Sequence, residues 1–491
     1  MSWSAYGASP SSEAADAAPG DPERPELRDF GRFGRMVVRR FVARARADDR
    51  PTFRSIIGGH LGVRLEDLGV VEENWPPYEH VNLQRALDAW LSTTGRSHRL
   101  LGLADYRHRG EFGLGDLLGE SQRMFGGPHP GNLTRVARAS GPGGQTHECL
   151  RAAVVLVEDR AGRLALLFRG PDHESDVHGV RIEAVADRDG VAAAAASELR
   201  ELAVQLNVHR GHVVSFGQDV FGERSSVLRF HERPRLSARD LILPAAVFED
   251  VRRQVVGVAA NRERLRASGQ HLKRGVLLFG PPGVGKTHTV RYLVSQLTDT
   301  TIVELTGETL GALREACSIA RSLEPAMIVV EDVDLIAEER DHYSGQTPML
   351  FTLLNEMDGL AEDADVVFLL TTNRPDLLEP ALAARPGRVD QAVHIDLPDR
   401  DARRRLVELY RGSLELDTSR LEDVLDRTDG VTASFLKELL RRAAVVAAGH
   451  EAPGSGVNGL RVTAEDLDRA LVELLDTRNA MTRAVLGYRE G

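Results

Sequence analysis

Eight residues from Gly280 to Thr287 have the types and spacing of a phosphate-binding loop. They read Gly-Pro-Pro-Gly-Val-Gly-Lys-Thr and match the pattern G-x-x-x-x-G-K-[ST]. Glycines let backbone N–H groups turn toward phosphate oxygens, and a helix that begins behind the loop adds its dipole. We expect Lys286 to reach the β- and γ-phosphates and the Thr287 hydroxyl to ligate Mg²⁺. The nucleotide-binding residues predicted from the loop are Gly280, Pro281, Pro282, Gly283, Val284, Gly285, Lys286, Thr287 and His288.

Three further groups of polar residues could complete a phosphoryl-transfer site. Glu331 and Asp332 directly follow the apolar run Met327–Val330. Such a site needs an acid on the metal side and a group that orients the attacking water, and these two carboxylates can supply both. Asn373 ends the run Val366–Leu370 after two threonines, so its amide would lie near the γ-phosphate if this strand neighbours the loop strand. Two arginines, Arg385 and Arg388, flank a Pro-Gly turn.

The ordered series GPPGVGKT, MIVVEDVD, LLNEMDGL, TTNRPD, ALAARPGRVD and DLPD resembles one module of the AAA ATPases, of bacterial type, within the AAA+ superfamily. The resemblance covers residues from about 240 to 476. It implies an ATP-hydrolysing enzyme that uses Mg²⁺ and assembles as a ring, usually a hexamer. By the same resemblance Glu331 lies on the magnesium side, Asp332 activates water, Asn373 is sensor 1, and Arg385 with Arg388 are arginine fingers for a neighbouring subunit. In the segment that resembles the helical lid, Ala433 and Ser434 would lie near adenine, and Tyr410 near the base or ribose.

The sequence departs from the family pattern at two functional positions. The acids of the Walker B segment are inverted, because the family places Asp before Glu, and Asp332 is one methylene shorter than the usual base. The aromatic residue of the family's pore loop is also missing, since no aromatic occurs between Tyr292 and Tyr343. We therefore expect that threading of a substrate polypeptide by an aromatic pore-loop residue is disfavoured. Leu305 or Leu310 could make a less specific contact with the substrate in its place. The segment Asp240–Pro244 replaces the family's entry to the adenine pocket, and residues 241–243 are predicted to pack the base.

Short runs rich in branched residues alternate with helical patterns around these motifs. The runs Val276–Phe279, Thr301–Leu305, Met327–Val330 and Val366–Leu370 are typical of buried parallel strands. The fold class expected is therefore α/β, with a P-loop NTPase sheet in a large subdomain over residues 240–400. A helical lid and C-terminal tail follow over 401–491, where Thr463 and Asp466 have capping-box spacing.

The N-terminal half shows folded-domain patterns without a diagnostic catalytic or metal-binding motif. We predict a disordered tail over 1–28, a helical domain over 29–125, a Gly- and Pro-rich linker over 126–147, and a small α+β domain over 148–236. The last begins with a hairpin around Asp159–Gly162, followed by an Ala-rich helix from about Val191 to Leu206. These regions are the expected recruiting domains.

Composition excludes several classes of protein. The net charge is −11, so a chain that mainly coats nucleic acid is not expected. Only two cysteines occur, no signal peptide is recognised at the N-terminus, and no apolar run is long enough to span a membrane; these features predict a cytoplasmic protein. Lysine occurs at Lys273, Lys286 and Lys437 alone, and the first and last follow leucine instead of glycine. The chain therefore has one phosphate-binding loop.

Two hypotheses of different classes remain. In the first, a homo-oligomeric ring, expected to be a hexamer, hydrolyses ATP to remodel an unidentified protein partner that the N-terminal domains recruit. In the second, the chain is an ATP-dependent scaffold or switch with little turnover, as the inverted acids and the missing pore aromatic permit. A GTPase or small-molecule kinase is disfavoured because no N-K-x-D guanine signature is present.

Overall fold

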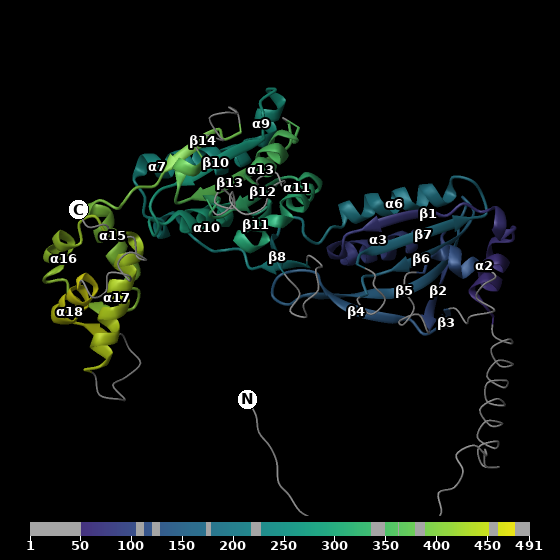
Figure 1. Ribbon diagram of the computed structural model, residues 1–491, viewed down its shortest axis with the longest axis horizontal. Helices are drawn as coiled ribbons and strands as arrows, with labels where there is room; N and C mark the ends of the chain where they lie inside the picture. Colours follow the sequence, from purple (N-terminus) through teal and green to yellow (C-terminus); the bar gives the residue numbers. More distant parts are fainter. Residues whose placement is uncertain are drawn as a thin grey trace, which may run out of the picture.

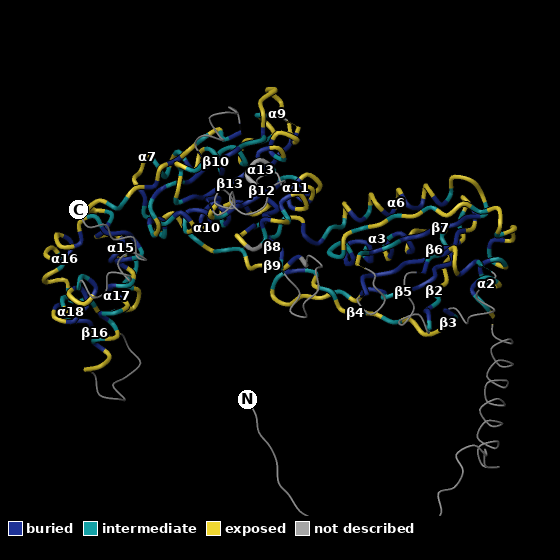
Figure 2. Tube along the Cα trace, in the orientation of Figure 1, coloured by how far each residue is buried: buried dark blue, intermediate teal, exposed yellow. Residues whose placement is uncertain are grey.

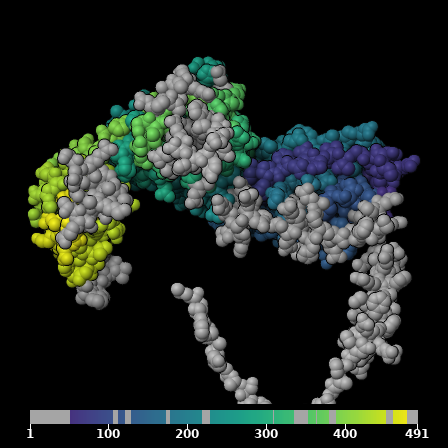
Figure 3. All heavy atoms as spheres, in the orientation of Figure 1, coloured from purple at the N-terminus to yellow at the C-terminus, as the bar shows by residue number. Residues whose placement is uncertain are grey.

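The computed structural model describes residues 51–104, 112–119, 128–172, 178–217, 227–334, 349–361, 363–378, 388–450 and 460–476. The predicted N-terminal tail lies outside these ranges, as do Arg385 and the last residues of the chain. The described elements gather in three bodies along the molecule (Figures 1 and 3): an N-terminal unit, a second α/β unit and a helical lid.

The N-terminal unit is a twisted antiparallel sheet with helices on both faces. Its strands are ordered β1-β7-β6-β5-β2-β3, and β4 pairs with the first half of β5. The two faces of β5 are both buried, Val155 against α3 and α6, and Val154 against α2 and α4. This explains the nearly continuous apolar run in its sequence. The elements are α2 (Phe53–Leu61), β1 (Val71–Trp75), α3 (His80–Leu91), β2 (Ser97–Ala104), α4 (Leu114–Leu118), β3 (His129–Gly131), β4 (Thr134–Ala139), β5 (Thr146–Glu158), β6 (Arg163–Arg169), β7 (Val180–Ala186) and α6 (Val191–Gln205).

The second unit contains a sheet of order β14-β10-β13-β12-β11-β8-β9, parallel except for β9. Helices α11 and α13 cover one face, and α7 and α10 cover the other (Figures 1 and 2). The elements are β8 (Val213–Gly217), β9 (Val227–His231), α7 (Ala245–Arg252), α8 (Val258–Ala260), α9 (Arg262–Ala267), β10 (Arg274–Phe279), α10 (Lys286–Gln296), β11 (Thr301–Leu305), α11 (Leu313–Ser322), β12 (Ala326–Val330), α13 (Met349–Asp358), β13 (Val366–Thr372) and β14 (Gln391–His394). All four strands predicted from apolar runs are present, so the expected α/β sheet is confirmed.

The lid is a small helical bundle with its own buried core. It consists of α15 (Arg400–Tyr410), α16 (Leu421–Arg427), α17 (Ala433–Ala448) and α18 (Ala464–Leu475), with a short parallel pair β15 (Glu415–Leu416) and β16 (Arg461–Val462). The predicted capping box is present, because the Thr463 side chain accepts from the Asp466 N–H and the Asp466 carboxylate accepts from the Thr463 N–H. Among the described helices, none has both the length and the apolar character that a membrane crossing requires.

The boundaries in the N-terminal half differ from those predicted. Strands β1 and β2 lie in the range predicted to be a helical domain, and β3 and β4 lie in the predicted linker, yet all four belong to one sheet with β5–β7. Strands β8 and β9 of the predicted α+β domain belong to the second sheet instead, where β8 pairs with β11 and β9 pairs with β8. The reason is that β1 and β4 alternate half-buried and exposed residues and so lack an apolar run.

A buried polar cluster joins the two units. Asn82 on α3 accepts a hydrogen bond from the Val208 N–H (2.8 Å), donates to Glu79 (2.7 Å) and lies 3.3 Å from Nδ1 of His209. The His209 ring stacks on Phe230 of β9 with 5.3 Å between centroids. Because these groups are buried and paired, the N-terminal unit is anchored to the added strands of the second sheet.

Candidate functional site

The phosphate-binding loop connects the carboxyl end of β10 to α10, as its sequence predicts. Gly280 has φ +149°, and a Cβ there would lie 2.1 Å from the carbonyl oxygen of Ile395. Gly283 has φ +80° and faces the lid, where a Cβ would lie 3.0 Å from Oγ1 of Thr432. Val284 is buried in the core, whereas Pro282 is exposed. Helix α10 begins at Lys286, so its unpaired N–H groups are available to an anion at the loop.

The ammonium group of Lys286 is held by three acceptors. Its Nζ donates to the carbonyl oxygens of Gly280 (2.8 Å) and Pro281 (2.9 Å) and to Oδ1 of Asn373 (2.8 Å). An ammonium has three donors, so every one is matched. Burial lowers the pKa of Lys286, and the carboxylates of Asp332 and Asp334 oppose this shift. The cation is thus placed inside the loop with its donors directed at oxygen atoms.

The two acids after β12 occupy different environments. Glu331 is half-buried, and its pKa is raised first by burial and then by the neighbouring Asp332 and Glu304, while a hydrogen bond from Thr287 lowers it. Thr287 and Glu331, the two predicted metal ligands, therefore lie together. A hydroxyl and a carboxylate are oxygen donors of the kind that Mg²⁺ prefers, so these residues fit the ion.

Asp332 has a left-handed backbone, with φ +53°, and is the one non-glycine residue with positive φ in the part of the chain that the structure describes. Its N–H donates to Oγ1 of Thr371 (3.1 Å), and its Oδ1 accepts from Nδ2 of Asn373 (3.2 Å). Asp and Asn are enriched in this conformation because their short polar side chains bond locally. The inverted order of the two acids thus places the shorter acid at the strained position.

Asn373 follows the end of β13 and lies between Lys286 and Asp332, with which it forms hydrogen bonds. Its position is set by Asp334, which the sequence analysis missed. The buried Oδ1 of Asp334 accepts from the Thr372 hydroxyl (2.8 Å) and from the Asn373 N–H (3.2 Å). No strand periodicity could have found Asp334, because β12 ends at Val330 and the backbone is left-handed at Asp332.

The lid contacts the loop directly. The Ser434 N–H donates to the Gly283 carbonyl oxygen at 3.1 Å, and Thr432 caps α17 by accepting from the Phe435 N–H (3.2 Å). Ala433 is buried beside them. Tyr410 packs against the lid core, with Nζ of Lys437 5.9 Å from the centroid of its ring. The structure thus brings Ala433 and Ser434 to the loop, whereas the contacts given above for Tyr410 are with residues of the lid.

The residues before β10 are packed differently from the prediction. Leu241 and Leu243 are buried in the core of the second unit, and Ile242 packs against the lid core. Residues 241–243 thus connect the two bodies. Nε2 of His288 lies 2.8 Å from the carbonyl oxygen of Asp240, which ties α10 to the same segment.

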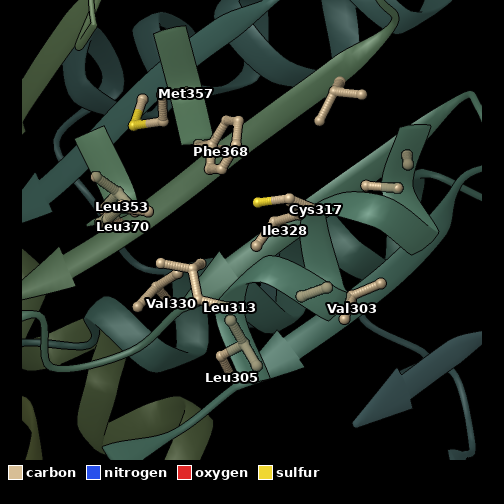
Figure 4. Packing of buried hydrophobic residues seen from close by; sticks show 14 of the residues in the cluster. Val303, Leu305, Leu313, Cys317, Ile328, Val330, Leu353, Met357, Phe368 and Leu370 are labelled. Atoms are coloured by element: carbon tan, nitrogen blue, oxygen red, sulfur yellow. The ribbon is translucent and has the colours of Figure 1, made fainter. Parts of the chain in front are cut away.

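The suggestion that Leu305 or Leu310 contacts a threaded substrate is wrong. Leu305 is fully buried and Leu310 is 5% exposed, and both belong to the core between β11, β12 and α11, where Figure 4 shows Leu305 beside Leu313. The short 3₁₀ segment Gly307–Ala312 follows β11 directly and leads into α11. The contact proposed for these side chains would require the core to open.

The arginine pair is described only in part. Arg385 lies outside the described residues. Arg388 is 5% exposed and forms an ion pair with Asp358 at the end of α13. Its backbone lies beside Gly275 at the start of β10, at the edge of the sheet opposite the phosphate-binding loop. Among the described residues, no cluster of three or more His, Cys, Asp or Glu could hold a further metal ion.

A model of the "ATPase family associated with various cellular activities (AAA)" matches residues 276–397. The ATP-dependent zinc metalloprotease FtsH 2 of Sphaerobacter thermophilus is 37% identical over 215 residues, 41% of this chain and 33% of the relative. FtsH 4 of the same organism is 31% identical over 303 residues (58% and 43%), and a Cell division cycle protein 48 homolog of Archaeoglobus fulgidus is 29% identical over 280 residues (50% and 38%). The alignments thus cover less than half the length of each of these relatives.

Proposed function

Because this chain carries an ATPase domain of the AAA family, we propose that it binds ATP with Mg²⁺ and hydrolyses it as a ring of identical subunits. The observation that carries the proposal is the contact chain from Lys286 through Asn373 to Asp332 at the carboxyl edge of a parallel sheet. In open α/β sheets this edge, next to the point where the strand order reverses, is where ligands bind. Here the reversal occurs at β10.

Each residue near the loop has a defined task in this proposal. Lys286 exchanges its present acceptors for β- and γ-phosphate oxygens, and the N–H groups at the start of α10 hold the remaining phosphate charge. Thr287 and Glu331 would hold Mg²⁺, which would neutralise charge that develops during transfer. Asp332 accepts a proton from the attacking water, and the Asn373 amide orients that water or the γ-phosphate.

The position of the arginine segment supports a shared site. Strand β10 has six residues, so its two ends lie about 17 Å apart. Arg388 lies beside one end and the phosphate-binding loop follows the other. No arginine side chain bridges that distance, so an arginine at this edge can contact a γ-phosphate only if the nucleotide belongs to another subunit. A ring, for which six subunits is the family's usual number, satisfies this requirement.

We place partner recognition in the N-terminal unit, which is anchored to the second sheet through β8 and β9. Two of the relatives named above are described as ATP-dependent zinc metalloproteases, but the 491 residues contain no His-Glu-x-x-His motif of the kind that binds catalytic zinc in such enzymes. The proposal for these residues is therefore remodelling of a protein partner without peptide hydrolysis.

A second candidate, an ATP-dependent switch with little turnover, is favoured by one observation. By the family resemblance Asp332 is the water-activating acid, with a shorter side chain than the usual glutamate, and Asn373 donates a hydrogen bond to it. An acid that has a short side chain and already accepts a hydrogen bond is less able to reach a water next to the γ-phosphate.

One assay separates the two candidates. Steady-state ATP hydrolysis and ATP-dependent oligomer mass are measured for the wild type, Lys286→Ala and Asp332→Asn. Turnover that is lost in both variants, with assembly retained by Asp332→Asn, supports the ATPase. Assembly on ATP with wild-type hydrolysis at background supports the switch. Mixed rings of Arg385→Ala and Lys286→Ala subunits should regain part of the activity, and no recovery in verified mixed rings contradicts the shared site.

A further inference from the structure

The guanidinium of Arg388 points into the protein. Its side chain is 4% exposed, and Nη2 donates to Oδ2 of Asp358, the last residue of α13. Nη1 is buried and has no hydrogen-bond partner among the residues that the structure describes. The carboxylate of Asp358 is 51% exposed, so the burial is on the arginine side of the pair.

The backbone around Arg388 is held as tightly as its side chain. A Cβ on Gly275 would lie 2.0 Å from the Arg388 carbonyl oxygen, so only glycine permits this approach. The Gly275 N–H donates to Oδ2 of Asp390 at 2.8 Å, and the Asp390 N–H donates to the Gly275 carbonyl oxygen at 2.8 Å. Arg388 is thereby fixed against the start of β10.

A second cation, Lys273, also binds the carboxyl end of α13. Nζ of Lys273 donates to the carbonyl oxygens of Met357 (3.2 Å) and Leu360 (3.4 Å), at the carboxyl end of α13. A cation there compensates unpaired carbonyl groups and the negative end of the helix dipole. Lys273 and Arg388 thus clamp the end of α13 to β10 from two directions.

This geometry conflicts with direct contact between Arg388 and a nucleotide. A finger must present its guanidinium at the protein surface, whereas Arg388 would have to leave Asp358 first. To do so it would give up the ion pair and the packing that surrounds its 4% exposed side chain. The observations fit a structural connection between α13 and the segment that leads into β14 better than a phosphate contact.

We propose that Arg388 is a positioning residue, which acts through Asp358 to hold the α13–β14 edge in the geometry that a neighbouring active site requires. The inference rests on the proposed function, since it assigns a role within the same shared site. It differs from the expectation, drawn from the family resemblance, that Arg388 touches the γ-phosphate. Asp358, which the sequence analysis did not single out, becomes a functional residue under this inference.

A charge exchange separates the two roles. ATP turnover and KM for ATP are measured for Arg388→Ala, Asp358→Asn and the double variant Asp358→Arg with Arg388→Asp. A positioning role predicts that each single variant lowers kcat by about hundredfold, as expected for a misplacement of about 1 Å. KM should be unchanged because the pair lies far from the subunit's own loop, and the double variant should recover most of the rate. The exposed hairpin pair Arg163 and Glu158, 3.3 Å apart, exchanged in the same way, is the matched control.

A finger role predicts the opposite pattern. Asp358→Asn would then keep the full rate, and the double variant would be inactive because an aspartate at 388 cannot donate to phosphate; either result overturns the proposal. If the double variant does not fold, Asp358→Asn with an unchanged melting temperature decides alone. Hydrolysis at background in the wild type contradicts the proposed function instead. The same variants are then compared by ATP-dependent oligomer mass. A positioning role predicts that each single variant lowers assembly and that the double variant recovers it, whereas full assembly by Asp358→Asn overturns the proposal.

Discussion

Lys286 donates a hydrogen bond to Oδ1 of Asn373 over 2.8 Å, although 87 positions separate the two residues in the sequence. The same amide donates from Nδ2 to Asp332. One side chain thus connects the cation of the phosphate-binding loop with the carboxylate at the end of the neighbouring strand. Because an amide has both donor and acceptor atoms, it can bridge two opposite charges at once.

Replacing Lys286 with arginine should be as damaging as replacing it with alanine. The three donors of the ammonium match three acceptors in a buried space, whereas a planar guanidinium has five donors in a fixed fork. We expect both variants to lose about hundredfold or more in turnover and to lose ATP binding, measured with a fluorescent nucleotide. Full binding by Lys286→Arg would show that charge alone is sufficient.

Asp332→Asn should remove turnover and leave the fold intact. Asparagine tolerates the left-handed backbone at φ +53° and keeps the side-chain size, but it has no carboxylate to accept a proton. The longer Asp332→Glu should unfold more easily than Asp332→Asn, by about 1 kcal/mol, because glutamate is less suited to this backbone. Urea unfolding of the two variants measures the difference, and equal stabilities contradict the argument from backbone strain.

Gly283→Ala should weaken the contact between the lid and the loop. A Cβ at Gly283 would lie 3.0 Å from Oγ1 of Thr432 and 3.1 Å from Cβ of Ser434, and the backbone has φ +80°. Gly285→Ala is the matched control, since its φ is +108° but a Cβ there meets nothing within 4 Å. Hydrogen exchange of the peptide that contains the Ser434 amide should accelerate in Gly283→Ala only, and equal acceleration in both would point to backbone strain.

Stability should fall as the pH is lowered from about 6.5 to about 4. Burial lowers the pKa of His80 and of His209 from 6.5 to about 4, so the unfolded chain binds more protons in this window. Burial raises the pKa of the nearby Glu79, which acts in the opposite sense because its contribution is lost as the pH rises through its folded-state value. His212, whose pKa burial also lowers, adds to the histidine effect.

The test of this pH dependence is urea unfolding at several pH values. His209→Phe keeps a ring against Phe230 and removes one titrating group, so its loss of stability toward acid should be shallower than that of the wild type. Replacement of the exposed His98 with phenylalanine serves as the control. An unchanged slope in His209→Phe is the outcome that removes this explanation.

The sequence predicted four strands of the second sheet closely, β10 to β13, because each is an apolar run that parallel packing buries on both faces. It placed Asn373 near the phosphate-binding loop on the condition that their strands are neighbours, and β10 and β13 do pair, so that the carboxyl ends of these strands share an edge. Asp334 was not predicted because its task is to hold Asn373, and this pairing depends on the register of β12 against β13.

The N-terminal half was predicted poorly for the same physical reason. Strands β1 and β4 expose alternate residues, and β8 lies far in sequence from β11, the strand that it pairs with. No local pattern specifies that β8 and β9 belong to the second sheet and not to the first. Their position depends on tertiary contacts at the junction of the two units, where Asn82, His209 and Phe230 pack together.

The sequence by itself determined the chemistry of this protein: one lysine in one glycine loop, a pair of acids and an amide, each at the end of an apolar strand. Local spacing suffices for these features because each motif is continuous in the chain. Only the tertiary structure decided that Arg388 faces Asp358 and that the short acid Asp332 takes the left-handed backbone. Both depend on contacts between segments that are far apart in the chain. These contacts are stabilised by burial, and the sequence of one segment does not reveal which of its residues the fold will bury.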